Sequence, residues 1–328
     1  MDRRRAGMVR GSLGILLALC CAAASAANAP GAAPANQFIT LGTHGGPVSD
    51  RNRSQPANAL VVGQQVYLVD AGDGAVQQLA RAGLSLAAVR AVFISHIHID
   101  HTGGLFAVLG LRHQMGTPGK ITVYGPPGTK AMVQGLLAAI VPEAESGYGV
   151  PGEDYVPPQG TVDVVELRDG MIKLEGFSVA VAENTHYSFP KGSDLDRRFA
   201  SISYRFNLPD RSIVYSGDTG PSESLTALAR GADLLVIELA DPAFAATFIA
   251  PGPGPQPKRL REMHDHMVNH HISPQQVGEI AAKAQVRRVV ITHLVAGRDP
   301  NVDTAPFVAG VRKIYTGPVE IANDLNRY

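Results

Sequence analysis

The segment Ser-His-Ile-His-Ile-Asp-His at residues 95–101 constrains the fold of this chain more than any other feature. It offers four metal-ligating side chains within six residues, and it follows an apolar run at residues 92–95 that predicts a short buried strand. Neutral imidazole and carboxylate groups suit zinc and related divalent ions, and this spacing lets one loop serve two adjacent ions. Because structural zinc sites usually contain cysteine, a set made of His96, His98, Asp100 and His101 favours a functional metal centre.

Three further candidate ligands lie where a predicted strand ends in a polar residue. They are His186, Asp218 and His293, and each follows an apolar run with the composition of a strand. Strand ends that face one rim of a sheet are where functional sites converge. A single histidine after a strand is more often incidental than a ligand, so the prediction rests on the whole set.

The rest of the chain is organised as two blocks of strands and helices of similar size. The first block predicts strands at 38–42, 59–62, 65–70, 92–95 and 121–124, with helices from about 74, 105 and 126, the last ending near 140. The second predicts strands at 162–167, 177–183, 201–206, 212–216, 234–238, 289–292 and 319–321, with helices at 222–229, 273–284 and 304–313. Loops are expected at 143–160 and 251–258. Two sheets packed face to face, with helices outside, accommodate this order.

The first 26 residues have the pattern of an export signal. Four arginines precede an apolar run at residues 13–24, and Ala24-Ser25-Ala26 fits a small-x-small cleavage site. The apolar run is too short for a comfortable membrane span. The sequence therefore predicts a signal peptide at 1–26 cleaved after Ala26, a flexible leader at 27–37 and one domain at 38–328, located in the periplasm or secreted. General secretory and twin-arginine export both stay open.

Charge and cysteine content limit the partners and the ligands. Lys+Arg and Asp+Glu both total 29, and removal of the predicted signal peptide leaves 25 basic against 28 acidic side chains. This balance argues against a nucleic acid or an anionic membrane held by overall positive charge. Both cysteines, Cys20 and Cys21, lie in the predicted signal peptide, so the remaining chain must hold a metal with histidine and carboxylate.

The seven candidate ligands together resemble the metallo-β-lactamase superfamily, over about residues 38–321. The resemblance implies an α/β fold, the αββα sandwich, in which two mixed β-sheets lie face to face with helices outside. It also implies a centre of two Zn²⁺ ions at one edge, with Mn²⁺ or iron as alternatives. His96, His98 and His186 would hold one ion, Asp100, His101 and His293 the other, and Asp218 would bridge them.

Within the superfamily, the sequence resembles the ribonuclease Z-like branch. The bridging Asp218 and the lack of a cysteine ligand differ from true β-lactamases, and the segment around His186 lacks the turn typical of glyoxalase II and lactonases. His271-Ile272-Ser273 is similar to the His-Ser-Thr motif of the branch, whose histidine contacts the scissile group. Ser49 stands where ribonuclease Z carries a lysine for RNA, and no basic Gly/Pro-rich arm for tRNA is evident. Residues 53–58 look like those of exported zinc-dependent arylsulfatases.

The resemblance therefore implies an exported hydrolase that cleaves sulfate esters by attack of a metal-bridging hydroxide. Asp100 would orient the hydroxide, and His271 would stabilise the anion or protonate the leaving oxygen. The alternative is a phosphodiesterase, of the cyclic-nucleotide or ribonuclease Z-like type, on the same site. A β-lactamase, a lactonase and a non-catalytic metal-binding protein are weaker alternatives. The expected partner is a small anionic ester, and a homodimer is compatible with the branch.

Four other features allow further interpretations. Residues 263–267 with His270 either line the substrate site or bind a third metal, or they form a solvated loop. Asp70 and Asp73 either hold the metal-binding histidines or stabilise a turn. The segment 148–155 either covers the pocket or is an inert insertion. Glu238, at the end of a predicted strand, is a candidate to orient His271.

Overall fold

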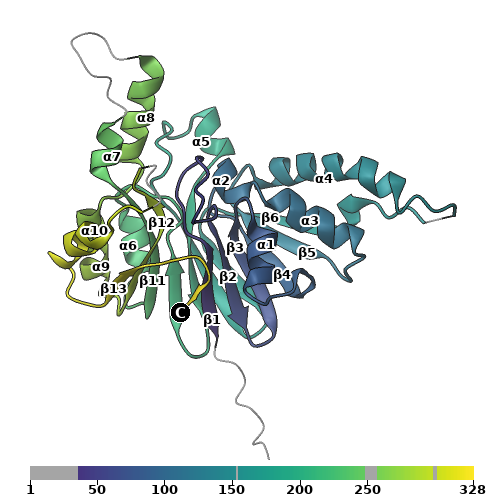
Figure 1. Cartoon of the computed structure of the whole chain (residues 1–328), viewed down its shortest axis with the longest axis horizontal. Coiled ribbons are helices and arrows are strands. Elements are labelled where there is room, and N and C mark those ends of the chain that lie inside the picture. Colours follow the sequence, from purple (N-terminus) through teal and green to yellow (C-terminus); the bar gives the residue numbers. More distant parts are fainter. Residues whose placement is uncertain (1–35, 153, 248–256, 298–300) are drawn as a thin grey trace, which may run out of the picture. The chain divides into compact units, whose positions relative to one another are not determined.

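Two seven-stranded sheets form the computed structural model of the protein, which describes residues 36–152, 154–247, 257–297 and 301–328 (Figure 1). The described residues belong to one folding unit. None of the helices in these ranges has both the length and the apolar character needed to cross a membrane. The predicted signal peptide and nearly all of the predicted leader, residues 1–35, lie outside the described residues.

The first sheet is built from the N-terminal half of the chain and closed by its C-terminus. Its strand order is β14-β1-β2-β3-β4-β5-β6, antiparallel from β14 to β3 and parallel from β3 to β6. Its strands are β1 (Gln37–Gly42), β2 (Ala57–Val62), β3 (Gln65–Ala71), β4 (Val89–Phe93), β5 (Ile121–Gly125), β6 (Val162–Glu166) and β14 (Asn326–Arg327). Its helices are α1 (Ala75–Arg81), α2 (Ile99–Thr102), α3 (Leu105–Gln114) and α4 (Thr129–Ser146), with 3₁₀ turns at Leu86–Ala88 and Pro158–Thr161.

The second sheet repeats this arrangement with the C-terminal half. Its order is β13-β12-β11-β10-β9-β8-β7, antiparallel from β7 to β10 and parallel from β10 to β13. Its strands are β7 (Gly170–Leu174), β8 (Phe177–Glu183), β9 (Ile202–Asn207), β10 (Ser212–Tyr215), β11 (Leu234–Ala240), β12 (Val289–Val295) and β13 (Val319–Ile321). Its helices are α5 (Asp194–Arg198), α6 (Glu223–Leu228), α7 (Pro242–Ala246), α8 (Lys258–Asn269), α9 (Pro274–Ala284) and α10 (Ala305–Arg312).

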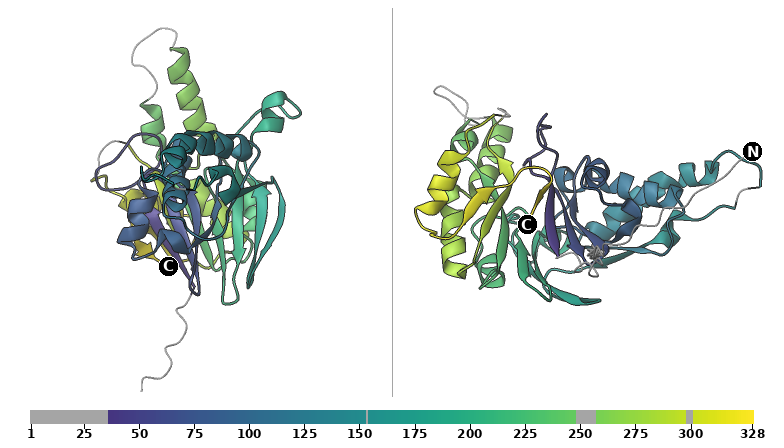
Figure 2. Two further views of the ribbon diagram at one scale, coloured as in Figure 1. Left: turned by 90° about the vertical axis from the view of Figure 1, so that its right-hand side faces the viewer. Right: turned by 60° about the horizontal axis from the view of Figure 1, so that its bottom comes forward.

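The positions of the buried side chains explain why two sheets and two sets of helices form layers. The parallel strands β11 and β12 are apolar along almost their whole length and are buried at every position, as expected of strands covered on both faces. In the core between the sheets, the Phe93 ring packs against the rings of Tyr204 and Phe206 from the opposite sheet. Separate cores lie between the first sheet and α1, α3 and α4, and between the second sheet and α6, α9 and α10. Figure 2 shows helices outside the two sheets. The expected αββα sandwich is confirmed.

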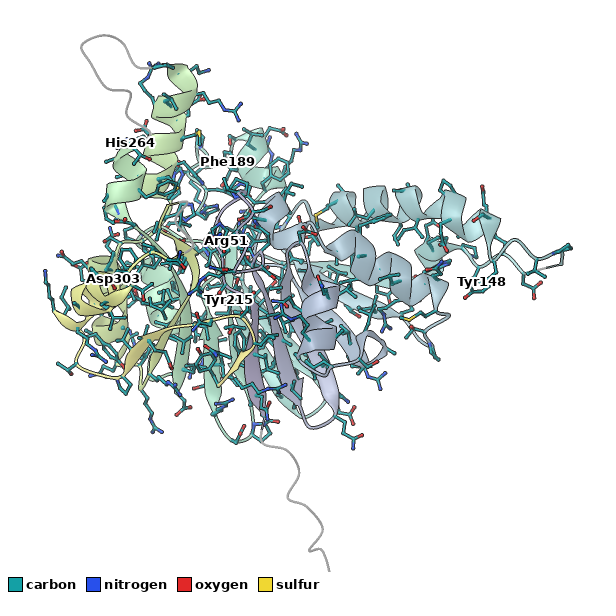
Figure 3. The ribbon with its side chains drawn as sticks, in the orientation of Figure 1. Arg51, Tyr148, Phe189, Tyr215, His264 and Asp303 are labelled. Atoms are coloured by element: carbon teal, nitrogen blue, oxygen red, sulfur yellow. The ribbon has the colours of Figure 1, made fainter. Side chains whose placement is uncertain are left out.

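The structure differs from the sequence prediction at several elements. Helix α4 continues through Pro142 to Ser146, so the predicted loop at 143–160 begins too early. Lys258, assigned to a loop, starts α8; residues 248–256 before it lie outside the described part. Strands β7 and β14 and helices α2, α5 and α7 were not predicted. Of the two interpretations of the segment around Tyr148, the structure does not support covering of the pocket. The Tyr148 hydroxyl bonds the Gln114 carbonyl, and Tyr148 lies far from Tyr215 in Figure 3.

Candidate metal centre

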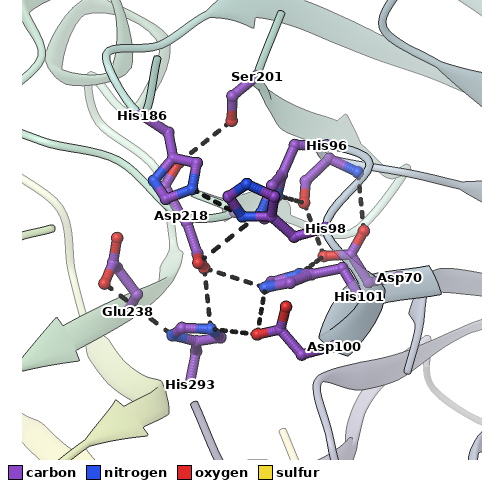
Figure 4. A network of polar contacts seen from close by, with 12 residues as sticks. Asp70, His96, His98, Asp100, His101, His186, Ser201, Asp218, Glu238 and His293 are labelled. Carbon is purple, nitrogen blue, oxygen red and sulfur yellow. Dashed lines mark hydrogen bonds and ion pairs between the residues drawn. The ribbon is translucent and has the colours of Figure 1, made fainter. Parts of the chain in front are cut away.

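The seven predicted ligands come together at one edge of the two sheets, from four separate segments (Figure 4). The loop after β4 and the short helix α2 carry the first four of them. His186 follows β8, Asp218 follows β10, and His293 lies near the end of β12. The first sheet therefore contributes one side of the centre and the second sheet the other.

Three histidines form the first ligand group. Nε2 of His96 lies 3.1 Å from Nδ1 of His98, which lies 3.2 Å from Nε2 of His186. Burial and the neighbouring imidazoles lower the pKa of His96 and of His186 well below the usual value of 6.5. Both rings are therefore neutral near pH 7, and three nitrogen atoms converge on one point, as a zinc ion requires.

Two carboxylates and two histidines form the second group. Oδ1 of Asp218 lies 3.3 Å from Nε2 of His101 and 3.2 Å from Nε2 of His293, and Oδ2 of Asp100 lies within 3.6 Å of both nitrogens. Burial favours the neutral form of His101, but the nearby carboxylates of Asp218, Asp100 and Asp70 outweigh it and raise its pKa well above 6.5. The carboxylates of this group therefore favour the protonated form of His101.

Unpartnered polar atoms test whether metal ions fit this site. Among the described residues, Nε2 of His101, Nε2 of His293 and Oδ1 of Asp218 are buried without a hydrogen-bond partner. Buried polar atoms rarely lack partners, and a divalent cation would satisfy all three at once. The other carboxylate oxygen of Asp218 lies 3.8 Å from Nε2 of His96, so Asp218 faces both groups. The residues present thus fit divalent metal, and Asp218 faces both ligand groups.

Asp70 fixes the orientation of the second group. Its carboxylate accepts hydrogen bonds from the backbone N–H of Ser95 at 2.7 Å, the hydroxyl of Ser95 at 2.8 Å and the hydroxyl of Tyr215 at 2.7 Å. It also bonds Nδ1 of His101 at 2.7 Å, which leaves Nε2 of that ring directed at the other ligands. Of the two interpretations of Asp70, the supporting role is therefore correct. Asp73, in contrast, lies exposed in the turn before α1.

Glycines let the supporting turn after β3 pack directly against the ligand loop. A Cβ at Gly72 would lie 2.2 Å from the carbonyl oxygen of Asp100, and one at Gly104 would lie 2.3 Å from the carbonyl oxygen of Gly72. Such distances leave no room for a side chain. Gly104, in the Gly-Gly pair after the ligand motif, thus allows a close backbone approach that a side chain would prevent.

His271 lies beside both ligand groups, oriented by Glu238. Its Nδ1 lies 2.7 Å from Oε2 of Glu238, and its ring is 5.0 Å from that of His186 and 6.0 Å from that of His293. Burial opposes the charged imidazolium, but the Glu238 carboxylate outweighs it and raises the pKa of His271 to about 9. A buried imidazolium next to the ligands can donate a proton to a bound group. The orientation by Glu238 is as predicted.

Helix α8 adds His266 to the site, a residue whose role the sequence prediction left open. Nε2 of His266 lies 3.3 Å from Nε2 of His271, and the His266 ring is 5.0 Å from the His186 ring. The solvated-loop interpretation of residues 263–267 is therefore wrong. Apolar residues at 260, 263 and 267 have helical spacing and could have indicated the helix.

Comparisons with known proteins agree with this geometry. Residues 65–294 match the family model of the Beta-lactamase superfamily domain. Ribonuclease Z of Mycobacterium avium (strain 104) is 32% identical over 298 residues, covering 88% of this chain and 96% of the relative. YhfI of Bacillus subtilis, a metallo-β-lactamase fold protein, superposes with a TM-score of 0.63 at 17% identity, covering 89% of this chain and 98% of YhfI. Human tRNase Z, short form, gives 0.60 at 21% identity, covering 89% and 98%.

YhfI and human tRNase Z share the fold of this chain. The ribonuclease Z of Mycobacterium avium also matches it in sequence, over most of the length of both proteins. The resemblance to arylsulfatases finds no support in these relatives. With its His/Asp clusters, the chain belongs to the metallo-β-lactamase superfamily, in the ribonuclease Z-like branch, and is a metal-dependent hydrolase.

Proposed function

We propose that the protein is a phosphodiesterase that uses two zinc ions and acts on small or short phosphodiesters. The observation that carries the proposal is the buried pair of His271 and Glu238 beside the ligands. A ribose or alkyl oxygen is a poor leaving group and needs a proton as its bond to phosphorus breaks, whereas an aryl oxide needs little. A positioned imidazolium suits the phosphodiester better than the aryl sulfate that was first expected.

The roles of the chain's own residues follow from their contacts. Bound divalent ions would activate water and neutralise charge on the ester oxygens. His96, His98 and His186 would hold one ion, Asp100, His101 and His293 the other, and Asp218 would lie between them. The Glu238 carboxylate holds the Nδ1 proton of His271, so that Nε2 presents the second proton toward the site. His271 would then donate that proton to the leaving oxygen.

The choice of a small substrate is supported by charge. The chain has no net positive charge, so the counterion release that strengthens binding to long nucleic acids is weakly available. The names of the relatives, ribonuclease Z and tRNase Z, support phosphodiester chemistry. Export through the segment at 1–26, with action outside the cytoplasm, is part of the proposal; a homodimer remains compatible with it.

A side-by-side assay tests the proposed function. The purified, zinc-loaded protein is given bis(4-nitrophenyl) phosphate, a cyclic nucleotide, 4-nitrophenyl sulfate and a cephalosporin. We expect the phosphodiesters to be turned over well above the other two, and His271→Asn to retain zinc while slowing the cyclic nucleotide about 100-fold, more than the nitrophenyl ester. Sulfate turnover above phosphodiester turnover would overturn the proposal.

A further inference from the structure

The position of helix α8 is not explained by packing of an apolar face on the core. It spans Lys258–Asn269, and none of its residues is buried. Helices in proteins are mostly held by an apolar face packed on the core. In Figure 1, α8 stands beside α7, beyond the edge of the sheet where β12 ends. Elements with few buried contacts often belong to ligand-binding parts of a protein.

The inward contacts of α8 are made by two histidines one turn apart. Nδ1 of His266 lies 3.1 Å from Nδ1 of His270, whose Nε2 lies 2.8 Å from the hydroxyl of Ser188. The Ser188 hydroxyl can donate to His270 Nε2, and His270 Nδ1–H can donate to His266 Nδ1. This chain of bonds places the remaining proton of a neutral His266 on Nε2, the atom that faces the metal centre.

A third metal ion explains these contacts less well. Nitrogen atoms of His186, His266 and His271 do lie within 4.8 Å of one another. However, Nε2 of His186 already converges with His98 in the first ligand group, and its Nδ1 bonds the backbone carbonyl of His270 at 2.9 Å. An ion held by His186 and His266 would take a ligand from the first group, so a hydrogen-bonding role for His266 fits the geometry better.

We propose that His266 is a substrate-binding residue, which donates its Nε2–H to an oxygen of the phosphate group held beside His271. This nitrogen faces Nε2 of His271 at 3.3 Å. With a proton on each of these nitrogens, the two N–H groups converge without an acceptor between them. A phosphate oxygen at this point would accept from His266 and leave Nε2 of His271 directed at the leaving oxygen. The inference rests on the proposed function for the identity of the ester. It gives helix α8 a role at the site, which is to hold His266 beside the substrate.

Phosphate binding to the zinc-loaded protein tests this role without requiring turnover. Inorganic phosphate is titrated calorimetrically into wild type, His266→Ala, His266→Gln and His264→Ala, and zinc content is measured for each. His264 is the matched control, because it lies two residues earlier on α8 and its ring contacts Asp265 (Figure 3). We expect His266→Ala to weaken phosphate binding about tenfold with zinc unchanged, the Gln variant to recover part of it through its amide N–H, and His264→Ala to match wild type.

Two results would overturn the inference: phosphate binding by His266→Ala equal to that of wild type, or loss of zinc from this variant, which would make His266 a metal ligand. The proposed function can fail separately. If wild type turns over no phosphodiester while its phosphate binding still depends on His266, the phosphodiesterase proposal falls and the binding role of His266 stands.

Discussion

At the scale of single residues, histidine has three different roles in this site, and the neighbouring groups determine which role each one has. His96 is surrounded by other imidazoles and by apolar protein, which keeps it neutral and able to bind a metal. His101 lies among three carboxylates, which hold a proton on it until a cation replaces that proton. His271 faces the buried Glu238 and keeps its proton for transfer. The environment therefore distinguishes ligands from a proton donor where residue type alone does not.

This difference predicts that the two ligand groups release different numbers of protons when they bind metal. At neutral pH the three-histidine group is already neutral, whereas His101 must lose its proton, so on zinc loading the second group should release about one proton more than the first, in addition to any proton lost by metal-bound water. Because the pKa of His101 is raised, its proton is retained as pH rises past 6.5, and zinc affinity of the second group should keep increasing above that pH.

Calorimetric zinc titration in buffers of different ionisation enthalpy measures the protons released. His101→Asn, which leaves the first group intact, is the control and should lower the release by about one proton. Equal proton release by both groups would show that the carboxylates do not hold His101 charged.

At the scale of secondary-structure elements, the sequence predicted the elements that have a local pattern and missed elements that depend on distant contacts. The buried strands and the ligand loop were predictable, because an apolar run followed by closely spaced ligands has a local pattern. Strand β14 has two residues and exists through its pairing with β1, nearly the whole chain away. Helix α8 is charged and follows a Pro/Gly-rich segment, which favoured a loop. The position of His266 over the ligands depends on tertiary structure and had no local signal.

The contact between the turn after β3 and α2 predicts contrasting effects of two glycine substitutions. Gly72→Ala would place a methyl group 2.2 Å from the Asp100 carbonyl oxygen, so we expect the free energy of unfolding to fall by about 1–3 kcal/mol and zinc content to drop. Gly135→Ala is the matched control. It lies exposed within α4, with no atom within 4 Å of the added methyl, and should raise the free energy of unfolding by about 0.5–1 kcal/mol. Urea denaturation and zinc analysis of both variants decide, and unchanged zinc in Gly72→Ala would contradict the proposed packing role.

At the scale of the whole molecule, the metal centre lies at the junction of two similar halves. The first half supplies four candidate ligands and the second supplies three, and Asp218 faces both groups. Hydrogen bonds also cross between the sheets, from Tyr215 to Asp70 at 2.7 Å and from Tyr204 to the Ile94 carbonyl at 2.7 Å. Burial and the Asp70 carboxylate raise the pKa of Tyr215 well above 10, so its hydroxyl stays a donor. The halves are thus joined by apolar packing, buried hydrogen bonds and, when present, metal.

Metal removal should therefore destabilise both halves together. A ligand that binds the folded state alone stabilises it by about 2.7 kcal/mol at one hundred times its dissociation constant, and here that ligand would join segments of both sheets. We expect a chelator to lower the thermal midpoint of wild type in a single transition, zinc to restore it, and Asp218→Ala to start near the chelated midpoint and respond less. Calorimetry with and without chelator measures this. Because each half has its own outer core, two separate transitions after chelation would mean that metal, rather than the packing between the sheets, makes the halves unfold as one.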